Sequence, residues 1–312
     1  MYNGNTAYEE GLKAIRDANE DDYSTILNLY PVSNHQAAEA AASQMDKTIE
    51  KCRKCIKLHS IKAKPKPDPK KRNDPKYRAW LQQEEFNNQM GEVWLRLGEA
   101  EFHKGDFLGS IGTFTYISRH YGTDPDMVAR CQLWIARAYG ELGWLYEAED
   151  MLHKVQIDAL DKKHARLYSA VSADILLKTK QYHAAIPFVK SAISNEKRKV
   201  YRPRFEYILG QLYELDGNKR EAVETYKKVI RLAPPTEMEF NARVHIAQLS
   251  GKSSLKQLRQ MARQSKYKDQ LDQIYGAMGN IYLASGDTAK ALENYHLAID
   301  NATQAGLQKA AV

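Results

Sequence analysis

Apolar residues recur three and four positions apart through most of the chain, which is the spacing of amphipathic helices. Glycines fall between these helices at regular places: Gly105, Gly143, Gly217 and Gly286. They are separated by 38, 74 and 69 residues, close to one, two and two copies of a unit of about 34 residues. The pattern predicts an all-α fold built from a repeated helix pair.

Each unit resembles the tetratricopeptide repeat, whose first helix carries W-x2-L-G-x2-Y and whose second carries A-x3-F. The first-helix matches are Trp94-x-x-Leu97-Gly98, Leu209-Gly210-x-x-Tyr213 and Met278-Gly279-x-x-Tyr282. The second-helix alanines are Ala148, Ala185, Ala222 and Ala291. Small residues at these places let the two helices approach closely. We therefore predict a tetratricopeptide-repeat superhelix (an α-solenoid) of about six repeats within residues 79–312, with a degenerate copy from Phe240 to Tyr267.

The first part of the chain is less regular, and we interpret residues 1–60 as divergent N-terminal helical repeats. Ala7–Ala18 and Tyr23–Tyr30 are expected to form a helix pair, and Gln36–Leu58 one long helix. A short helix is expected at Tyr77–Phe86. Residues 61–78 separate these parts as a proline-rich loop or linker.

Charge is concentrated in that loop. The chain of 312 residues has a formal net charge of +7, and the stretch from Lys62 to Arg78 holds eight basic and two acidic residues, a net of +6. Alternating prolines there favour an extended, solvated loop. No aromatic stacking platform accompanies the charge, so we expect no nucleic acid partner. A hydrophilic insert is the favoured interpretation, and contact with an acidic partner the second.

Catalytic chemistry finds little support in the sequence. Cys52-Arg53-Lys54-Cys55 has C-x-x-C spacing but falls late in an expected helix, away from any strand. Buried or idle thiols are favoured there over a disulfide, and a disulfide over catalysis; Cys131 is expected in the core. The histidines form no local ligand motif, and phosphate-binding or nucleotide-binding glycine motifs are absent. We expect no catalytic site, no metal and no cofactor, and hence not an enzyme.

Without a catalytic motif, the candidate functional residues are those on the surface. Peptides usually bind this fold along the inner face of the first helices. The expected groove residues are Glu92, Leu95, Glu99, Phe102, Arg130, Leu133, Arg137, Arg204, Tyr207 and Gln211. No repeat has the Lys and Asn pair that clamps a terminal carboxylate in chaperone adaptors. A second candidate is a basic patch, for which a solvated loop remains the favoured alternative. Its residues are Lys197, Arg198, Lys199 and Arg202.

Several segments that repeat packing does not require resemble the PorW/SprE-type lipoproteins of the type IX secretion system. They include Tyr30-Pro31-Val32-Ser33-Asn34, Ile56–Lys62, Lys71–Tyr77, and Gly105–Leu108 followed by Tyr116-Ile117-x-x-His120-Tyr121. The resemblance covers residues 1 to 155 with specific segments.

This resemblance implies a non-enzymatic scaffold that binds other protein subunits of a secretion or gliding machine. It implies a periplasmic, outer-membrane-associated lipoprotein, attached to the membrane only through an N-terminal lipid anchor that this chain lacks. The absent anchor and the uncapped end at Val312 lead us to expect a fragment of a longer protein. An oxidising periplasm would favour a disulfide at Cys52 and Cys55. The alternative is a cytoplasmic tetratricopeptide-repeat adaptor that binds peptides.

Overall fold

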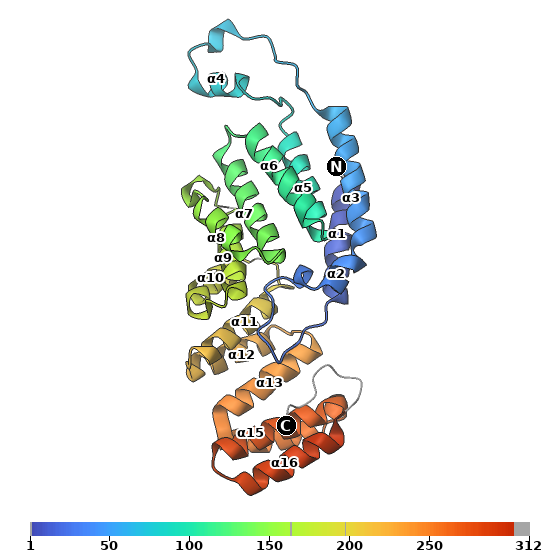
Figure 1. The fold of residues 1–312 in the computed structure, drawn as a ribbon, viewed down its shortest axis with the longest axis vertical. Coiled ribbons are helices and arrows are strands. Elements are labelled where there is room, and N and C mark those ends of the chain that lie inside the picture. The colour runs from blue at the N-terminus through green and yellow to red at the C-terminus, as the bar shows by residue number, and fades with distance from the viewer. Residues whose placement is uncertain (1, 163, 197, 303–312) are drawn as a thin grey trace. The chain divides into compact units, whose positions relative to one another are not determined.

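The computed structural model describes residues 2–162, 164–196 and 198–302 of the chain (Figure 1). Across these residues the regular secondary structure is entirely helical, which confirms the all-α prediction. The chain divides into two compact units. Unit 1 comprises Met1–Glu20 and Tyr30–Gln181, and unit 2 comprises Asp21–Leu29 and Tyr182–Val312.

Unit 1 carries the first nine α-helices. They are α1 (Tyr2–Ala18), α2 (His35–Ala40), α3 (Ala42–His59), α4 (Pro75–Leu81), α5 (Met90–His103), α6 (Phe107–His120), α7 (Pro125–Glu141), α8 (Leu145–His153) and α9 (Ala165–Lys178). Short 3-10 helices lie at Pro31–Ser33, Pro69–Lys71 and Ile157–Ala159. Helix α3 packs against both α1 and α5, and α5 against α6, so the N-terminal helices and the first repeats share one core.

Unit 2 carries the remaining helices. They are α10 (Tyr182–Asn195), α11 (Arg202–Leu215), α12 (Lys219–Arg231), α13 (Thr236–Ser250), α14 (Leu255–Ala262), α15 (Leu271–Ala284) and α16 (Thr288–Asn301), with 3-10 helices at Gly251–Ser254 and Ser265–Gln270. Helices α13 and α14 overlap the stretch from Phe240 to Tyr267, where the degenerate copy is expected.

The small residue of α11 does what its spacing predicts. A Cβ added to Gly210 would lie 2.7 Å from Cε1 of Tyr226, closer than real side chains approach. Tyr226 is fully buried on α12, so the missing side chain on α11 makes room for its ring. The turn that follows needs Gly217, whose φ of +74° lies in the left-handed region.

The expectation of a helix at Tyr23–Tyr30 is wrong, because these residues form no helix. The Asp22 carboxylate accepts hydrogen bonds from the Ser24 amide at 2.9 Å and from the Ser24 hydroxyl at 2.6 Å, which turns the chain at this point. Beyond the turn, the Thr25 carbonyl and the Leu27 amide are hydrogen-bonded to the distant side chain of Gln211. Such long-range partners override local helix propensity.

Two further helix boundaries differ from expectation. Gln36–Leu58 is not one helix, because Ala41 interrupts it with φ −97° and ψ −3°, and its amide bonds back to Ala38 and Glu39. Ala41 is fully buried within the core of unit 1. The helix expected at Tyr77–Phe86 is α4, which ends at Leu81.

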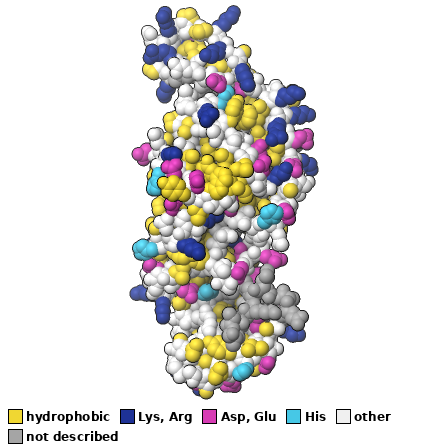
Figure 2. Space-filling model, viewed as in Figure 1, with side chains coloured by type: hydrophobic (Ala, Val, Ile, Leu, Met, Phe, Trp, Pro, Cys, Tyr) yellow, Lys and Arg dark blue, Asp and Glu magenta, His cyan; other side chains and the backbone are white. Residues whose placement is uncertain are grey.

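The basic loop is an excursion from unit 1 rather than a boundary between units. Its base is closed where the Phe86 amide donates to the Ile61 carbonyl at 2.9 Å and the Ile61 amide donates to the Glu85 carboxylate at 2.8 Å. Figure 2 shows Lys and Arg side chains gathered around this excursion, where Figure 1 places α4. The N-terminal repeats expected at residues 1–60 and the array expected at residues 79–312 do not coincide with the two units. Helix α3 of the first packs directly on α5 of the second, and both lie in unit 1.

A further property concerns membranes. Among the helices of the described residues, none combines the length and apolar character needed to cross a bilayer.

Candidate functional site

Three of the expected groove residues lie together on α11. Arg204, Tyr207 and Gln211 are spaced three and four residues apart, so their side chains share one face of the helix. All three are covered, with 8%, 0% and 6% of their surfaces exposed. The segment Asp21–Leu29, which belongs to the same unit, lies against this face and contacts all three (Figure 1).

Arg204 binds this segment at two places. Its Nη1 atom donates to both carboxylate oxygens of Asp21, at 2.8 and 2.7 Å, and its Nε atom donates to the main-chain carbonyl of Asn28 at 2.8 Å. The ion pair is almost removed from water, since the Arg204 and Asp21 side chains are 9% and 13% exposed. Charge-assisted hydrogen bonds of this kind are the strong ones in proteins.

Gln211 recognises the main chain of the same segment. Its side-chain oxygen accepts a hydrogen bond from the Leu27 amide at 3.1 Å, and its side-chain nitrogen donates to the Thr25 carbonyl at 2.7 Å. These two bonds satisfy main-chain groups that would otherwise be buried without partners. One side chain of α11 therefore holds the main chain of the segment without depending on the segment's side chains.

Aromatic contacts complete the face. The Tyr23 ring meets the Tyr207 ring edge to face, with centroids 5.3 Å apart, and Tyr207 in turn meets Tyr226 at 5.3 Å. Burial raises the pKa of both Tyr23 and Tyr207 above the usual value of a phenol, so both rings are neutral at physiological pH. On this face α11 therefore packs an aromatic side chain of the segment.

In unit 1 the apolar residues expected in the groove lie in the core. Leu95, Phe102 and Leu133 are each at most 1% exposed. They are therefore not available as surface in this conformation.

The charged groove residues of unit 1 pair with one another or with neighbours. Arg130 donates to both oxygens of Glu92, at 2.7 and 3.0 Å, which joins α7 to α5. Glu99 accepts from Arg96 at 2.6 Å. Burial raises the pKa of Glu99, although the nearby guanidinium of Arg96 opposes this.

Arg137, the remaining expected groove residue of unit 1, is 3% exposed and enclosed by aromatic rings. Its guanidinium lies 3.9 Å from the centre of the Tyr30 ring, 4.4 Å from Trp134 and 4.5 Å from Phe102. Cation–π contacts of this type hold the residues after Asp21–Leu29 against α7.

A buried ionic cluster in unit 1 was not predicted. Lys178 donates to Asp174 at 2.8 Å and to Glu141 at 3.1 Å, and Ser33 donates to Glu141 at 3.0 Å. Burial raises the pKa of Glu141, and Lys178 opposes this. The spacing of Asp174 and Lys178, four residues apart on α9, is the only sequence signal that could have indicated part of this cluster.

The residues of the expected basic patch do not act together. Lys197 lies outside the described residues. Arg198 donates to the Glu196 carboxylate at 2.9 and 3.0 Å, while Lys199 is exposed to solvent. Arg202 begins α11 and is only partly exposed. The acidic neighbour Glu196 therefore neutralises part of the patch.

The cysteines carry no disulfide among themselves in this structure. Burial raises the pKa of the Cys52 thiol to about 11 and that of Cys131 to about 12. Both are thus thiols rather than nucleophilic thiolates at neutral pH. The favoured interpretation of buried thiols agrees with this geometry for Cys52, whereas Cys55 is only half-buried.

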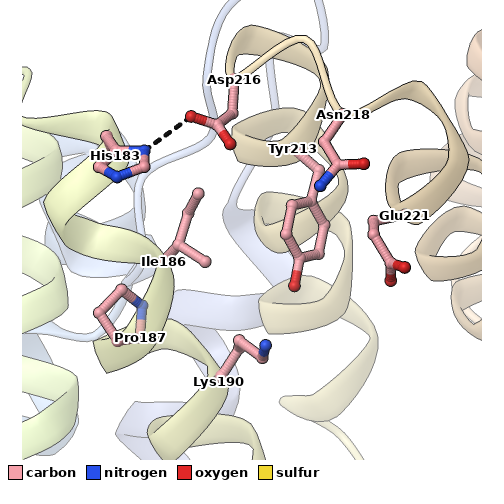
Figure 3. A pocket seen from close by; sticks show the side chains of 8 residues that line it. All are labelled: His183, Ile186, Pro187, Lys190, Tyr213, Asp216, Asn218 and Glu221. Atoms are coloured by element: carbon pink, nitrogen blue, oxygen red, sulfur yellow. Dashed lines mark hydrogen bonds and ion pairs between the residues drawn. The ribbon is translucent and has the colours of Figure 1, made fainter.

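One surface pocket opens between α10, α11 and α12, with a volume of about 440 Å³ (Figure 3). It is lined by His183, Ile186, Pro187, Lys190, Tyr213, Asp216, Asn218 and Glu221. His183 Nδ1 and the Asp216 carboxylate are within hydrogen-bonding distance, 2.7 Å, across one end of it. His183 is largely exposed, so the pocket is an open depression between helices and does not enclose reactive groups.

Three potential metal ligands also come together, at Asp126, Asp161 and His164, within 4.8 Å of one another. The Asp126 carboxylate already accepts from the Asp161 amide at 2.7 Å and from His164 at 2.8 Å. The Arg130 guanidinium lies 3.8 Å from it, and this positive charge opposes a cation. We assign no metal to these residues.

Comparison with known protein families identifies the type of repeat. The family described as tetratricopeptide repeat matches residues 207–236 and 272–303, which fall on α11–α12 and α15–α16. The chain contains tetratricopeptide repeats. This fold is typically a non-catalytic module that binds protein or peptide partners, and at this level the protein is a protein–protein interaction scaffold.

Solved structures similar to this tetratricopeptide-repeat protein are distant. MamA from Desulfovibrio magneticus RS-1 is 16% identical, with 68% of this chain and 94% of that chain covered and a TM-score of 0.39. The Rap conjugation gene regulator of the plasmid pLS20, in complex with the Phr* peptide, is 16% identical, with coverages of 86% and 69% and a TM-score of 0.43. The TPR2AB domain of yeast Sti1 is 14% identical, with coverages of 96% and 99% and a TM-score of 0.25. No curated protein matches the chain.

Proposed function

We propose that this protein is a non-enzymatic scaffold that binds an extended polypeptide on one face of α11. This face, called the α11 face below, carries Arg204, Tyr207 and Gln211. The observation that carries the proposal is the pair of hydrogen bonds by which Gln211 donates to the Thr25 carbonyl and accepts from the Leu27 amide. A side chain that satisfies a main-chain amide and carbonyl of an extended segment provides binding for many sequences. Arg204 and Tyr207 add selectivity for a carboxylate and an aromatic ring.

We further propose that the machine served by this scaffold is a type IX secretion or gliding apparatus. The support is the resemblance of residues 1 to 155 to the PorW/SprE-type lipoproteins, in segments such as Tyr30–Asn34 and Lys71–Tyr77. On this proposal the partners are other envelope proteins, and the protein works in the periplasm at the outer membrane. None of the similar solved structures bears on this assignment.

Affinity capture with two baits tests the proposal. The first bait is the full chain, and the second is the same chain with Arg204→Ala and Gln211→Ala. We expect identified components of the secretion machine to be recovered from an envelope extract by the first bait and lost with the second. Recovery of cytosolic proteins alone would instead favour a cytoplasmic adaptor and overturn the envelope assignment. Equal recovery by both baits would show that the α11 face does not bind these partners.

A further inference from the structure

The face of α11 is occupied by nine residues of the same chain that have the geometry of a bound peptide. Asp21–Leu29 contains no helix, and its buried side chains Tyr23, Leu27 and Leu29 are 7%, 3% and 1% exposed. Its sequence pattern predicts a helix, so the non-helical form is imposed by what it binds. Arg204, Tyr207 and Gln211 supply those contacts.

We propose that Asp21–Leu29 is an internal ligand that closes the α11 face, and that an external partner binds by displacing it with a segment of the same chemistry. That chemistry is a non-helical stretch carrying a carboxylate, an aromatic ring two residues later, and leucines six and eight residues after the carboxylate. The inference rests on the function proposed above, and it names the class of partner and the regulation of the same site.

The contacts separate the required positions from the permissive ones. Asp21 is required because both of its carboxylate oxygens accept a hydrogen bond from Arg204 Nη1. Tyr23 is required because its ring packs against the ring of Tyr207. Asn28 contributes only its main-chain carbonyl to Arg204, and its residue is exposed. A competing segment therefore needs the side chains of the first two positions and tolerates any residue at the place of Asn28.

The covalent link makes the internal ligand an effective competitor. A segment tethered close to its site acts at an effective concentration on the order of millimolar. An external peptide then binds with an affinity reduced by the fraction of molecules whose face is open. Weakening the internal segment must consequently strengthen external binding, which is the opposite of what loss of a merely structural contact would do.

A fluorescent peptide with the sequence of residues 19–31 is the probe, and its anisotropy is measured against the full chain. We expect weak binding to the natural chain and at least tenfold tighter binding to the variant Asp21→Ala/Tyr23→Ala. The matched control Asn28→Ala should bind the peptide as the natural chain does. Adding Arg204→Ala to the double variant should weaken binding at least tenfold, and Arg204→Lys should restore part of it.

Equal affinity for the natural chain and the Asp21→Ala/Tyr23→Ala variant would overturn the proposal, as would indifference to Arg204→Ala. A concentration-dependent dimer of the natural chain, lost with Asp21→Ala, would also overturn it, because the occupant would then be a second copy. These outcomes are independent of the capture experiment, since a purified chain and a synthetic peptide involve no secretion machine.

Hydrogen exchange of the natural chain keeps the test valid if the double variant does not fold. Saturating peptide should accelerate exchange at the Leu27 amide, which loses its bond to Gln211 when the segment leaves the face. The amides inside α11 should remain protected. Unchanged exchange at Leu27 in the presence of millimolar peptide would contradict displacement.

Discussion

The backbone of Gly98 faces the ring of Phe114 so closely that an added Cβ would lie 2.8 Å from the ring atom Cζ. Phe114 is fully buried on α6, and Gly98 lies on α5. The absence of one side chain therefore sets the distance between the two helices of the first repeat. Volume added at this position must be accommodated by a ring that has no room to move.

Gly98→Ala is accordingly expected to destabilise unit 1. Alanine favours a helix over glycine by about 1 kcal/mol, but overpacking of a filled core costs about 1–3 kcal/mol, so the clash prevails. Urea unfolding followed by tryptophan fluorescence measures this, since all four tryptophans lie in unit 1.

Gly112→Ala is the matched control. Gly112 lies inside α6, and an added Cβ would meet nothing within 4 Å. We expect this variant to be more stable by about 0.5–1 kcal/mol. A loss of stability equal to that of Gly98→Ala would show that glycine itself, and not the fit against Phe114, matters.

The cluster around Lys178 predicts an asymmetric response to substitution. Lys178→Met leaves the carboxylates of Glu141 and Asp174, 4% and 1% exposed, facing each other without a cation. Removing one partner of a buried pair costs about 3–5 kcal/mol, which urea unfolding would detect. Adding Glu141→Gln to Lys178→Met should recover part of the loss. A double variant less stable than Lys178→Met would contradict this account.

Thiol chemistry provides a third prediction. At pH 7.5 the natural chain should react rapidly with a thiol reagent at a single cysteine, the half-buried Cys55, because burial raises the pKa of Cys52 to about 11 and keeps it a buried thiol. Cys55→Ser should abolish the fast phase, and Cys52→Ser should not. Two fast thiols in the reduced protein would contradict the prediction.

Local periodicity predicts the repeats because their determinants are close together in sequence. Gly210 and the ring of Tyr226 that covers it are sixteen residues apart, within one repeat. The spacing of Arg204, Tyr207 and Gln211 is likewise enough to place their side chains on one face of a helix. Such features depend only on helical geometry and on the size of one or two side chains.

The occupant of that face could not be predicted in the same way. Gln211 is 184 residues from Leu27 in sequence, and no local pattern links an amide side chain to so distant a main-chain group. The polar turn at Asp22 is a signal against a helix, but the helical spacing of Tyr23, Ile26, Leu27 and Tyr30 outweighs it. Distant partners, which local spacing does not register, also explain why Phe102 and Arg137 are expected on a surface and lie buried.

The burial of His103 predicts that unit 1 loses stability in mild acid. His103 is enclosed by the rings of Tyr8, Phe102 and Trp134, and its Nδ1 atom donates to the Glu99 carbonyl at 2.8 Å. Burial, together with the positive charges of Arg137 and Arg96, lowers the pKa of His103 to about 3. The imidazole is therefore neutral in the folded protein.

Below a pH of about 6.5 the unfolded chain binds a proton at His103, whereas the folded chain does not. The free energy of unfolding then falls by about 1.4 kcal/mol for each pH unit, until the pH reaches the folded pKa. Between pH 7 and pH 5 this single group should remove roughly 2 kcal/mol of stability.

His103→Asn isolates this contribution, because its amide nitrogen can still donate to the Glu99 carbonyl while nothing at the position titrates. The variant is expected to be less stable at pH 7, since a smaller side chain leaves a cavity among the rings. Its stability should nevertheless depend less on pH than that of the natural chain. Unfolding in urea at pH 7, 6 and 5, followed by tryptophan fluorescence, measures both curves. Parallel curves would mean that His103 binds its proton equally in the folded and unfolded chains, and would contradict the burial-driven pKa.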